Sequence, residues 1–240
     1  MDGSAEFTVC ALLYGGTEYH HLHRRCLQSF QNLPSHCELR VALNSVTCVE
    51  TRELLGQLAD KLRGRLSLID GENMPKYRRM RQLLEIQPVG RIVMWFDDDS
   101  YLDARVAQDP TEWLSRISTE LVSCDMLGSI YRLRAWKPGQ EQWIRAQPWF
   151  RGLPIPDQPS FITGGWWAAR ASLLVETGWP WPELSHNGGD VMLGVCMQQS
   201  GVKQRHFRES VRINADGDGR ESAAKRRGLS EPPLGSGFSG

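Results

Sequence analysis

The alternation of strand-like and helix-like segments over the first 96 residues constrains the fold of this chain most strongly. Apolar runs typical of buried strands alternate with segments whose apolar residues recur every three or four positions, the helical period. The predicted strands cover 7–16, 37–46, 65–70 and 91–96, and the predicted helices cover 21–33, 49–62 and 77–86. This order is typical of parallel strands joined by crossover helices. The sequence therefore predicts an α/β fold with a central, mostly parallel sheet flanked by helices.

The second half of the chain is less regular. It predicts a helix over 109–124, a strand over 125–136 and an irregular layer over 137–160. Residues 161–178 predict a strand, a glycine turn, a second strand and a short helix, and a further helix begins near Asp190. Residues 203–207 predict a last short strand. From 214 to 240 the chain is rich in Gly, Ser, Pro and charge, so we expect a flexible tail there.

Charge and cysteine usage exclude several classes of protein. Lys+Arg and Asp+Glu number 28 each, so no overall field attracts nucleic acid or an anionic membrane. The six cysteines show no CxxC spacing, which favours buried free thiols in a reducing compartment over disulfides or a zinc site. No apolar stretch reaches the length of a membrane span, and the N-terminus lacks a signal-peptide pattern. We expect a cytoplasmic protein with no membrane contact.

Candidate ligand-binding residues lie at the carboxyl ends of the four predicted strands. Gly15, Asn44 and Asp70 lie at the ends of the first three, and the run 97–99 lies at the end of the fourth. In open α/β sheets ligands bind beyond the carboxyl ends of the strands. The sequence therefore predicts one crevice on which four loops converge.

Three consecutive carboxylates, Asp97, Asp98 and Asp99, follow five apolar residues of the fourth strand. Adjacent like charges raise one another's pKa, so we expect a cation there. Carboxylates at positions i and i+2 suit Mg²⁺ or Mn²⁺, which prefer oxygen ligands and often bridge to substrate phosphates. The alternative is an exposed acidic turn, but the apolar strand before it favours a metal site.

Other phosphate-binding folds do not match. The chain has no G-x-x-x-x-G-K-[ST] loop, and GGTEYH after the first strand does not match a dinucleotide fingerprint. An aspartyl phosphatase would carry its acidic pair on the first strand. What remains is a fold that binds a nucleotide diphosphate through a metal at mid-chain.

The order of these features resembles the GT-A glycosyltransferases, especially their family-two-like group. The resemblance covers about residues 7 to 207. It is carried by Tyr14, Gly15, Asn44, the basic helix start 76–81, the D-x-D at 97–99, the segment 164–166 and Asp190. The chain departs from the group at Asn44, where Asp is usual, and where NMPKYRRMR replaces a glycine- and Ala-Arg-Asn-bearing segment. The resemblance implies a single GT-A-like domain over 1–213, with a nucleotide-sugar half of about 1–100 and an acceptor half of about 101–213.

The activity that this resemblance implies is metal-dependent, inverting transfer of a sugar from a nucleotide diphosphate sugar, with UDP-sugars expected. Asp97 and Asp99 would hold the metal, Mn²⁺ or Mg²⁺, which would stabilise the departing diphosphate as a Lewis acid. His206 would be a further metal ligand or an ordinary polar residue. Asp190 would be the general base, a helix N-cap, or both.

The resemblance also implies a set of donor contacts. They are Tyr14, Gly15, Asn44, Asp70, Lys76, Arg79, Asp97, Asp98, Gly165 and Trp166. Lys76 or Arg79 would stabilise the leaving group, or would only solvate a helix face. Trp166 would form the floor under the sugar, or would belong to the core.

The acceptor is left open between a glycan, a protein and a small molecule. The Trp- and Arg-rich stretch 131–151 could hold a glycan, or could stack on bases as single-strand nucleic-acid platforms do. Hydroxymethylated DNA is therefore an alternative acceptor. A nucleotidyltransferase and a noncatalytic glycan- or nucleic-acid-binding module are the two alternatives from other classes.

Overall fold

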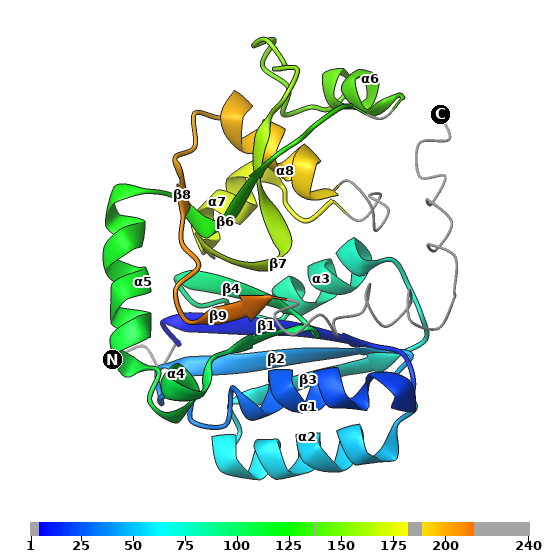
Figure 1. Ribbon diagram of the computed structural model, residues 1–240, viewed down its shortest axis with the longest axis vertical. Coiled ribbons are helices and arrows are strands. Elements are labelled where there is room, and N and C mark those ends of the chain that lie inside the picture. Colours follow the sequence, from blue (N-terminus) through cyan, green and yellow to red (C-terminus); the bar gives the residue numbers. More distant parts are fainter. Residues whose placement is uncertain (1–4, 137, 182–188, 214–240) are drawn as a thin grey trace.

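A seven-stranded sheet runs through the computed structural model, which describes residues 5–136, 138–181 and 189–213 (Figure 1). Its strands lie in the order β3-β2-β1-β4-β7-β6-β8. They are β1 (Phe7–Tyr14), β2 (Cys37–Asn44), β3 (Leu66–Gly71), β4 (Ile92–Asp97), β6 (Met126–Arg132), β7 (Ser160–Arg170) and β8 (Gln204–His206). β1 to β4 are parallel, β7 is antiparallel to both β4 and β6, and β8 is parallel to β6. The predicted fold class is confirmed.

Helices cover both faces of this sheet (Figure 1). One face packs against α1 (His20–Gln28), α2 (Val49–Leu62) and α5 (Thr111–Ser123), and the other against α3 (Lys76–Glu85), α7 (Ala171–Thr177) and α8 (Gly189–Gln199). Successive side chains of a strand point to opposite faces. In β1, Val9 and Ala11 therefore join the first core, whereas Cys10 and Leu12 join the second. Burial on both faces explains why the strands are apolar along most of their length.

A second, smaller sheet is present that no local sequence pattern predicted. It consists of β5 (Ser100–Leu102), directly after β4, paired antiparallel with β9 (Val211–Ile213). The remaining elements are short: η1 (Thr17–Tyr19), α4 (Ala104–Gln108) and α6 (Gln140–Arg145). The predicted tail, 214–240, lies outside the described residues.

The predicted glycine turn within 161–178 is wrong. β7 is one strand from Ser160 to Arg170, with no turn that divides it. The glycines instead occupy an irregularity within the strand: the β6–β7 register shifts between Ile162 and Trp167, and neither ladder pairs Gly164 or Gly165. Glycine inside a strand often marks such a bulge or a close approach of another group. The short helix and its end at Gly178, with φ of 66°, are confirmed.

A buried arginine fixes α3 against the sheet. Arg40 of β2 is fully buried and donates to the carbonyls of Leu83 (2.8 Å), Ile86 (2.5 Å) and Pro88. These carbonyls lie at the end of α3 and in the turn before β4, so one side chain holds both segments to β2. The first turn of the same helix carries Lys76, one of the candidate site residues.

We predict that Arg40→Leu lowers the free energy of unfolding by about 3 kcal/mol, because buried carbonyls lose their donors. Urea unfolding followed by circular dichroism measures this. Arg78→Leu, on the exposed side of α3, is the matched control and should change little. Equal effects of the two substitutions would contradict the role given to Arg40.

Candidate active site

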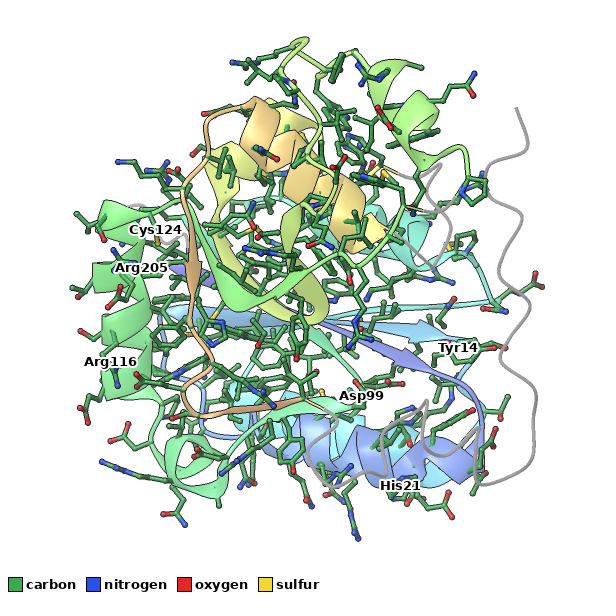
Figure 2. The ribbon with its side chains drawn as sticks, turned by 45° about the horizontal axis from the view of Figure 1, so that its top comes forward. Tyr14, His21, Asp99, Arg116, Cys124 and Arg205 are labelled. Atoms are coloured by element: carbon green, nitrogen blue, oxygen red, sulfur yellow. The ribbon has the colours of Figure 1, made fainter. Side chains whose placement is uncertain are left out.

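The carboxyl ends of the four parallel strands meet at one edge of the sheet, as predicted. Tyr14, at the end of β1, is in register with Asn44, which in turn pairs with Gly71 of β3. Asp97, the last residue of β4, pairs with Leu12 of β1. Figure 2 shows Tyr14 and Asp99 toward the same end of the sheet. Gly15 follows with φ of 92°, a conformation that favours glycine and turns the chain out of β1.

Asp97 is neutralised by a lysine from the neighbouring helix. Its Oδ2 lies 2.7 Å from Lys76 Nζ, and its Oδ1 accepts a hydrogen bond of 2.8 Å from Trp95 Nε1. Only 8% of the Lys76 side chain is exposed. Burial alone would lower the pKa of Lys76, but Asp97 and Asp190 outweigh burial and raise it. Lys76 is therefore a charged, buried partner of Asp97.

Asp190, at the start of α8, faces the same lysine from another segment of the chain. Its Oδ2 accepts a hydrogen bond of 2.7 Å from Gly164 N, and its Oδ1 lies 3.3 Å from the Tyr77 hydroxyl. Burial raises the pKa of Asp190, and the Lys76 ammonium and the Gly164 N–H offset only part of this rise. A carboxylate with a raised pKa is a better proton acceptor near neutral pH.

Lys76, Asp97 and Asp190 form one cluster of charged side chains. Gly164 of β7 lets the main chain pass close to this cluster. A Cβ on Gly164 would lie 2.5 Å from Asp190 Oδ1 and 3.0 Å from Lys76 Nζ. Lys76 also donates to the Gly164 carbonyl at 3.3 Å. A Cβ on Gly165 would instead lie 2.7 Å from Ile213 Cγ2, toward the small sheet. Gly164 therefore belongs to the cluster, and Gly165 does not.

Asp98, in the turn after β4, contacts other partners than Asp97 does. It accepts a hydrogen bond of 3.2 Å from Tyr14 N and lies 3.5 Å from His23 Nε2. His23 is fully buried and also contacts Thr51 Oγ1 at 3.2 Å. Asp98 therefore ties the end of β4 to β1 and α1. Asp99, 8% exposed, directly precedes β5.

The Asn44 side chain forms its hydrogen bonds within the protein, to the loop before α3. Its Nδ2 donates to Met74 O at 2.9 Å and to Asn73 Oδ1 at 3.2 Å, and its Oδ1 accepts from Met74 N at 2.9 Å. The carboxamide thus holds the loop before α3. The Asn in place of the usual Asp has a local reason, since a carboxylate could not donate to Met74.

Asp70 and Arg79 also pair with neighbours within the protein. Asp70 forms two bonds with Arg52, at 2.5 and 3.2 Å, and Arg52 lowers the pKa of its carboxyl. Arg79 is 3% exposed and donates to Glu72 O at 2.7 Å. Both side chains hold the edge around β3, and neither reaches the cluster of Lys76 and Asp190 by any contact that the structure shows.

Trp166 and His206 lie away from the cluster of Lys76, Asp97 and Asp190. Trp166 is fully buried, and its ring packs 5.9 Å from that of Trp113, so it belongs to the core. His206 lies on β8, three strands from β4, which corresponds to about 14 Å at the usual strand spacing. Its Nδ1 is 3.2 Å from Ile130 N. It therefore cannot share a metal with Asp97 in this arrangement.

Sequence reasoning missed two groups of the cluster. Trp95 could have been found, because residues i and i+2 of a strand share a face and so Trp95 lies beside Asp97. Tyr77 is adjacent to Lys76 in the sequence, but nothing local indicates that it meets Asp190, 113 positions away.

Within the described ranges, no three His, Cys, Asp or Glu side chains group closely enough to hold a metal ion. No helix in that part of the chain has the length and apolarity to cross a membrane.

Solved structures of similar fold include glycosyltransferases. A fragment of S. aureus TarS, residues 1–349, superposes with a TM-score of 0.57 at 16% identity, covering 90% of this chain and 63% of that one. The mannosyltransferase PcManGT from Pyrobaculum calidifontis, in complex with GDP-Man and Mn²⁺, gives 0.54 at 16% identity, covering 86% of this chain and 56% of that one. The TarS fragment with UDP-GlcNAc gives 0.53 at 14% identity, covering 85% and 56%.

These likenesses establish the fold: the chain has a GT-A-like fold, as the resemblance in sequence order implied. The chain spans only 56% and 63% of the length of the mannosyltransferase and of the TarS fragment. No protein-family model matches the sequence. A search of curated proteins finds no match either.

We predict that Asn44→Asp lowers the free energy of unfolding by about 2 kcal/mol, because a carboxylate would face Met74 O and Asn73 Oδ1 without a proton to donate. Urea unfolding measures the change. Gln57→Glu, the same change of amide to carboxylate at an exposed position of α2, is the matched control. If both variants lose the same stability, Asn44 does not hold the loop.

Proposed function

We propose that this protein is a metal-dependent, inverting glycosyltransferase that moves a sugar from a UDP-sugar to a hydroxyl acceptor. One observation carries the proposal: Asp97 and Asp190, from the end of β4 and the start of α8, converge on Lys76 beside Gly164. They do so next to the carboxyl edge of the parallel strands, where such sheets bind ligands. The GT-A-like fold supports the same reading.

The proposed donor is a nucleotide diphosphate sugar. The structurally similar mannosyltransferase was solved with GDP-Man, and the TarS fragment with UDP and with UDP-GlcNAc. UDP is the nucleotide we propose here. Tyr14, 37% exposed, and Gly15 lie in the turn after β1, where they can flank the nucleoside.

The residues present suit Mg²⁺ or Mn²⁺. The candidate ligands, Asp99 and Asp97, offer only carboxylate oxygens, the donors that these ions prefer. Each oxygen has two lone pairs, so Asp97 keeps acceptor capacity beside Lys76 and Trp95. Two protein ligands are enough for an ion that takes further oxygens from the donor phosphates. A bound ion supplies Lewis-acid stabilisation of the diphosphate leaving group.

Asp190 is the proposed general base. The Gly164 N–H holds Oδ2, and the raised pKa improves the carboxylate as an acceptor of the proton from the attacking hydroxyl. In an inverting transfer that hydroxyl attacks opposite the leaving group. Lys76, next to Asp97, adds a fixed positive charge near the diphosphate.

The proposed acceptor is a hydroxyl of a glycan, a protein or a small molecule. In the Trp- and Arg-rich stretch, Trp143 and Trp149 pack at 6.3 Å, and both pack on Trp181, at 5.8 and 4.9 Å. Rings stacked on one another offer less area to nucleic-acid bases than a row of free rings does. Modified DNA is therefore included as one of the acceptors in the assay.

Incubation with Mn²⁺ and a panel of UDP- and GDP-sugars tests the proposal. We expect release of UDP from at least one donor, loss of release with EDTA, and a glycosylated product by mass spectrometry with a glycan, protein, small-molecule or DNA acceptor. Release of pyrophosphate with nucleotidyl transfer would indicate the nucleotidyltransferase. Glycan or DNA binding with no nucleotide binding would indicate the noncatalytic module.

We predict that Asp99→Ala weakens Mn²⁺-dependent binding of UDP by more than about 100-fold. Loss of a residue that only hydrogen-bonds to a metal ligand already lowers metal affinity about ten- to hundredfold, and loss of a ligand itself should lower it more. Isothermal titration calorimetry with and without Mn²⁺ measures this. Asp60→Ala, at an exposed position of α2, is the control and should bind as the wild type does. Unchanged metal dependence in Asp99→Ala would exclude Asp99 as a ligand.

We predict that Asp190→Asn lowers kcat by about 10²–10⁴-fold, the range for loss of a general base, and leaves donor affinity within about twofold. Single-turnover kinetics and donor titration separate the two quantities. Normal turnover of Asp190→Asn would remove Asp190 from the mechanism.

A further inference from the structure

The first two residues of α3 contact the cluster at different points. Lys76 binds Asp97 and the Gly164 carbonyl, and Tyr77 lies against Asp190. We propose that Tyr77 is a positioning residue that orients the Asp190 carboxylate for proton transfer. The proposal rests on the function proposed above for Asp190 and adds a residue that the sequence did not single out.

The Tyr77 ring is fixed from two sides. It is 1% exposed and meets the Trp179 ring edge to face, with centroids 5.1 Å apart. On the other side it lies against the backbone of Gly189, where an added Cβ would be 2.0 Å from the Tyr77 hydroxyl oxygen. A ring held between Trp179 and the first residue of α8 has little freedom, so the position of its hydroxyl is set relative to Asp190.

Two donors from different elements then hold the two oxygens of Asp190. Gly164 N–H of β7 binds Oδ2 at 2.7 Å, and Tyr77 O–H of α3 donates to Oδ1 at 3.3 Å. Together they restrain rotation of the carboxylate about its last bond. The second contact is long, as catalytic hydrogen bonds often are without substrate.

The charges around Asp190 keep Tyr77 a donor. Burial, followed by the charge of Asp190, raises the pKa of Tyr77 well above its usual value, so the hydroxyl stays protonated through the working range. Lys76 of α3 favours the ionised form of Asp190, and Asp97 of β4 opposes it. The Tyr77 hydroxyl and the Gly164 N–H also favour the ionised form. Removing the hydroxyl should therefore make Asp190 harder to ionise.

Tyr77→Phe tests the proposal, because it removes the hydroxyl and keeps the ring that packs on Trp179. We expect kcat to fall about tenfold, donor KM to stay within about twofold, and the acidic limb of the kcat–pH profile to move up by about half a unit to one unit. Tyr101→Phe, on β5, is the matched control: it removes a tyrosine hydroxyl, keeps the ring beneath Arg25, and should change none of these.

Two results would overturn the proposal. One is an unchanged kcat and an unmoved acidic limb in Tyr77→Phe. The other is a loss of kcat with a large fall in Tm and a matching rise in donor KM, which would show that Tyr77 only supports the fold.

A readout that needs no turnover separates this proposal from the proposed function. Carbon-13 NMR of labelled aspartate carboxyls, with the Asp190 signal identified by its loss in Asp190→Asn, gives the pKa of Asp190 directly. We expect a higher pKa in Tyr77→Phe than in the wild type, and equal values would overturn the positioning role. If no donor is turned over, the proposed function fails, while this titration still decides whether Tyr77 acts on Asp190.

Discussion

The ion pair between Lys76 and Asp97 holds the first turn of α3 against the end of β4. Both groups are largely removed from water, and a buried charge without a partner is costly. The pair therefore constrains everything attached to it: the Trp95 indole on the other Asp97 oxygen, the Gly164 carbonyl on Lys76, and through Gly164 the carboxylate of Asp190. The adjacent carboxylates are tolerated because they take separate partners: Asp97 pairs with Lys76, and Asp98, in the turn after β4, lies beside His23.

Long, regular patterns made most of the sheet predictable. β1 to β4 and the helices α2 and α3 lie close to where periodicity placed them, because each buries a continuous apolar face. Prediction from the sequence failed for strands whose structure is decided by contacts between distant segments. β7 continues past two glycines as an irregular strand, because its flanking residues pair with β6 before them and with both β6 and β4 after them. β5 and β9 are too short to show a period, and they exist because the chain returns beside Ser100 after more than a hundred residues.

Within the site, topology was predictable and pairing was not. Parallel strands bring their carboxyl ends together, so the meeting of Tyr14, Asn44 and Asp97 at one edge followed from the order of elements. Which partner each side chain takes depends on contacts between distant segments. Asn44 binds Met74, 30 positions away, and Trp166 packs into the core because its side of β7 faces α5. No local pattern encodes these choices.

The missing side chain at Gly164 has a consequence for recognising related chains. The position has room for hydrogen only, since Asp190 and Lys76 both occupy the space that a methyl group would need. The requirement links residues 26 and 88 positions apart, far beyond the reach of a short signature. A distant homologue that keeps this lysine and this aspartate is therefore expected to keep glycine between them, and a chain with alanine there must have rearranged these two side chains.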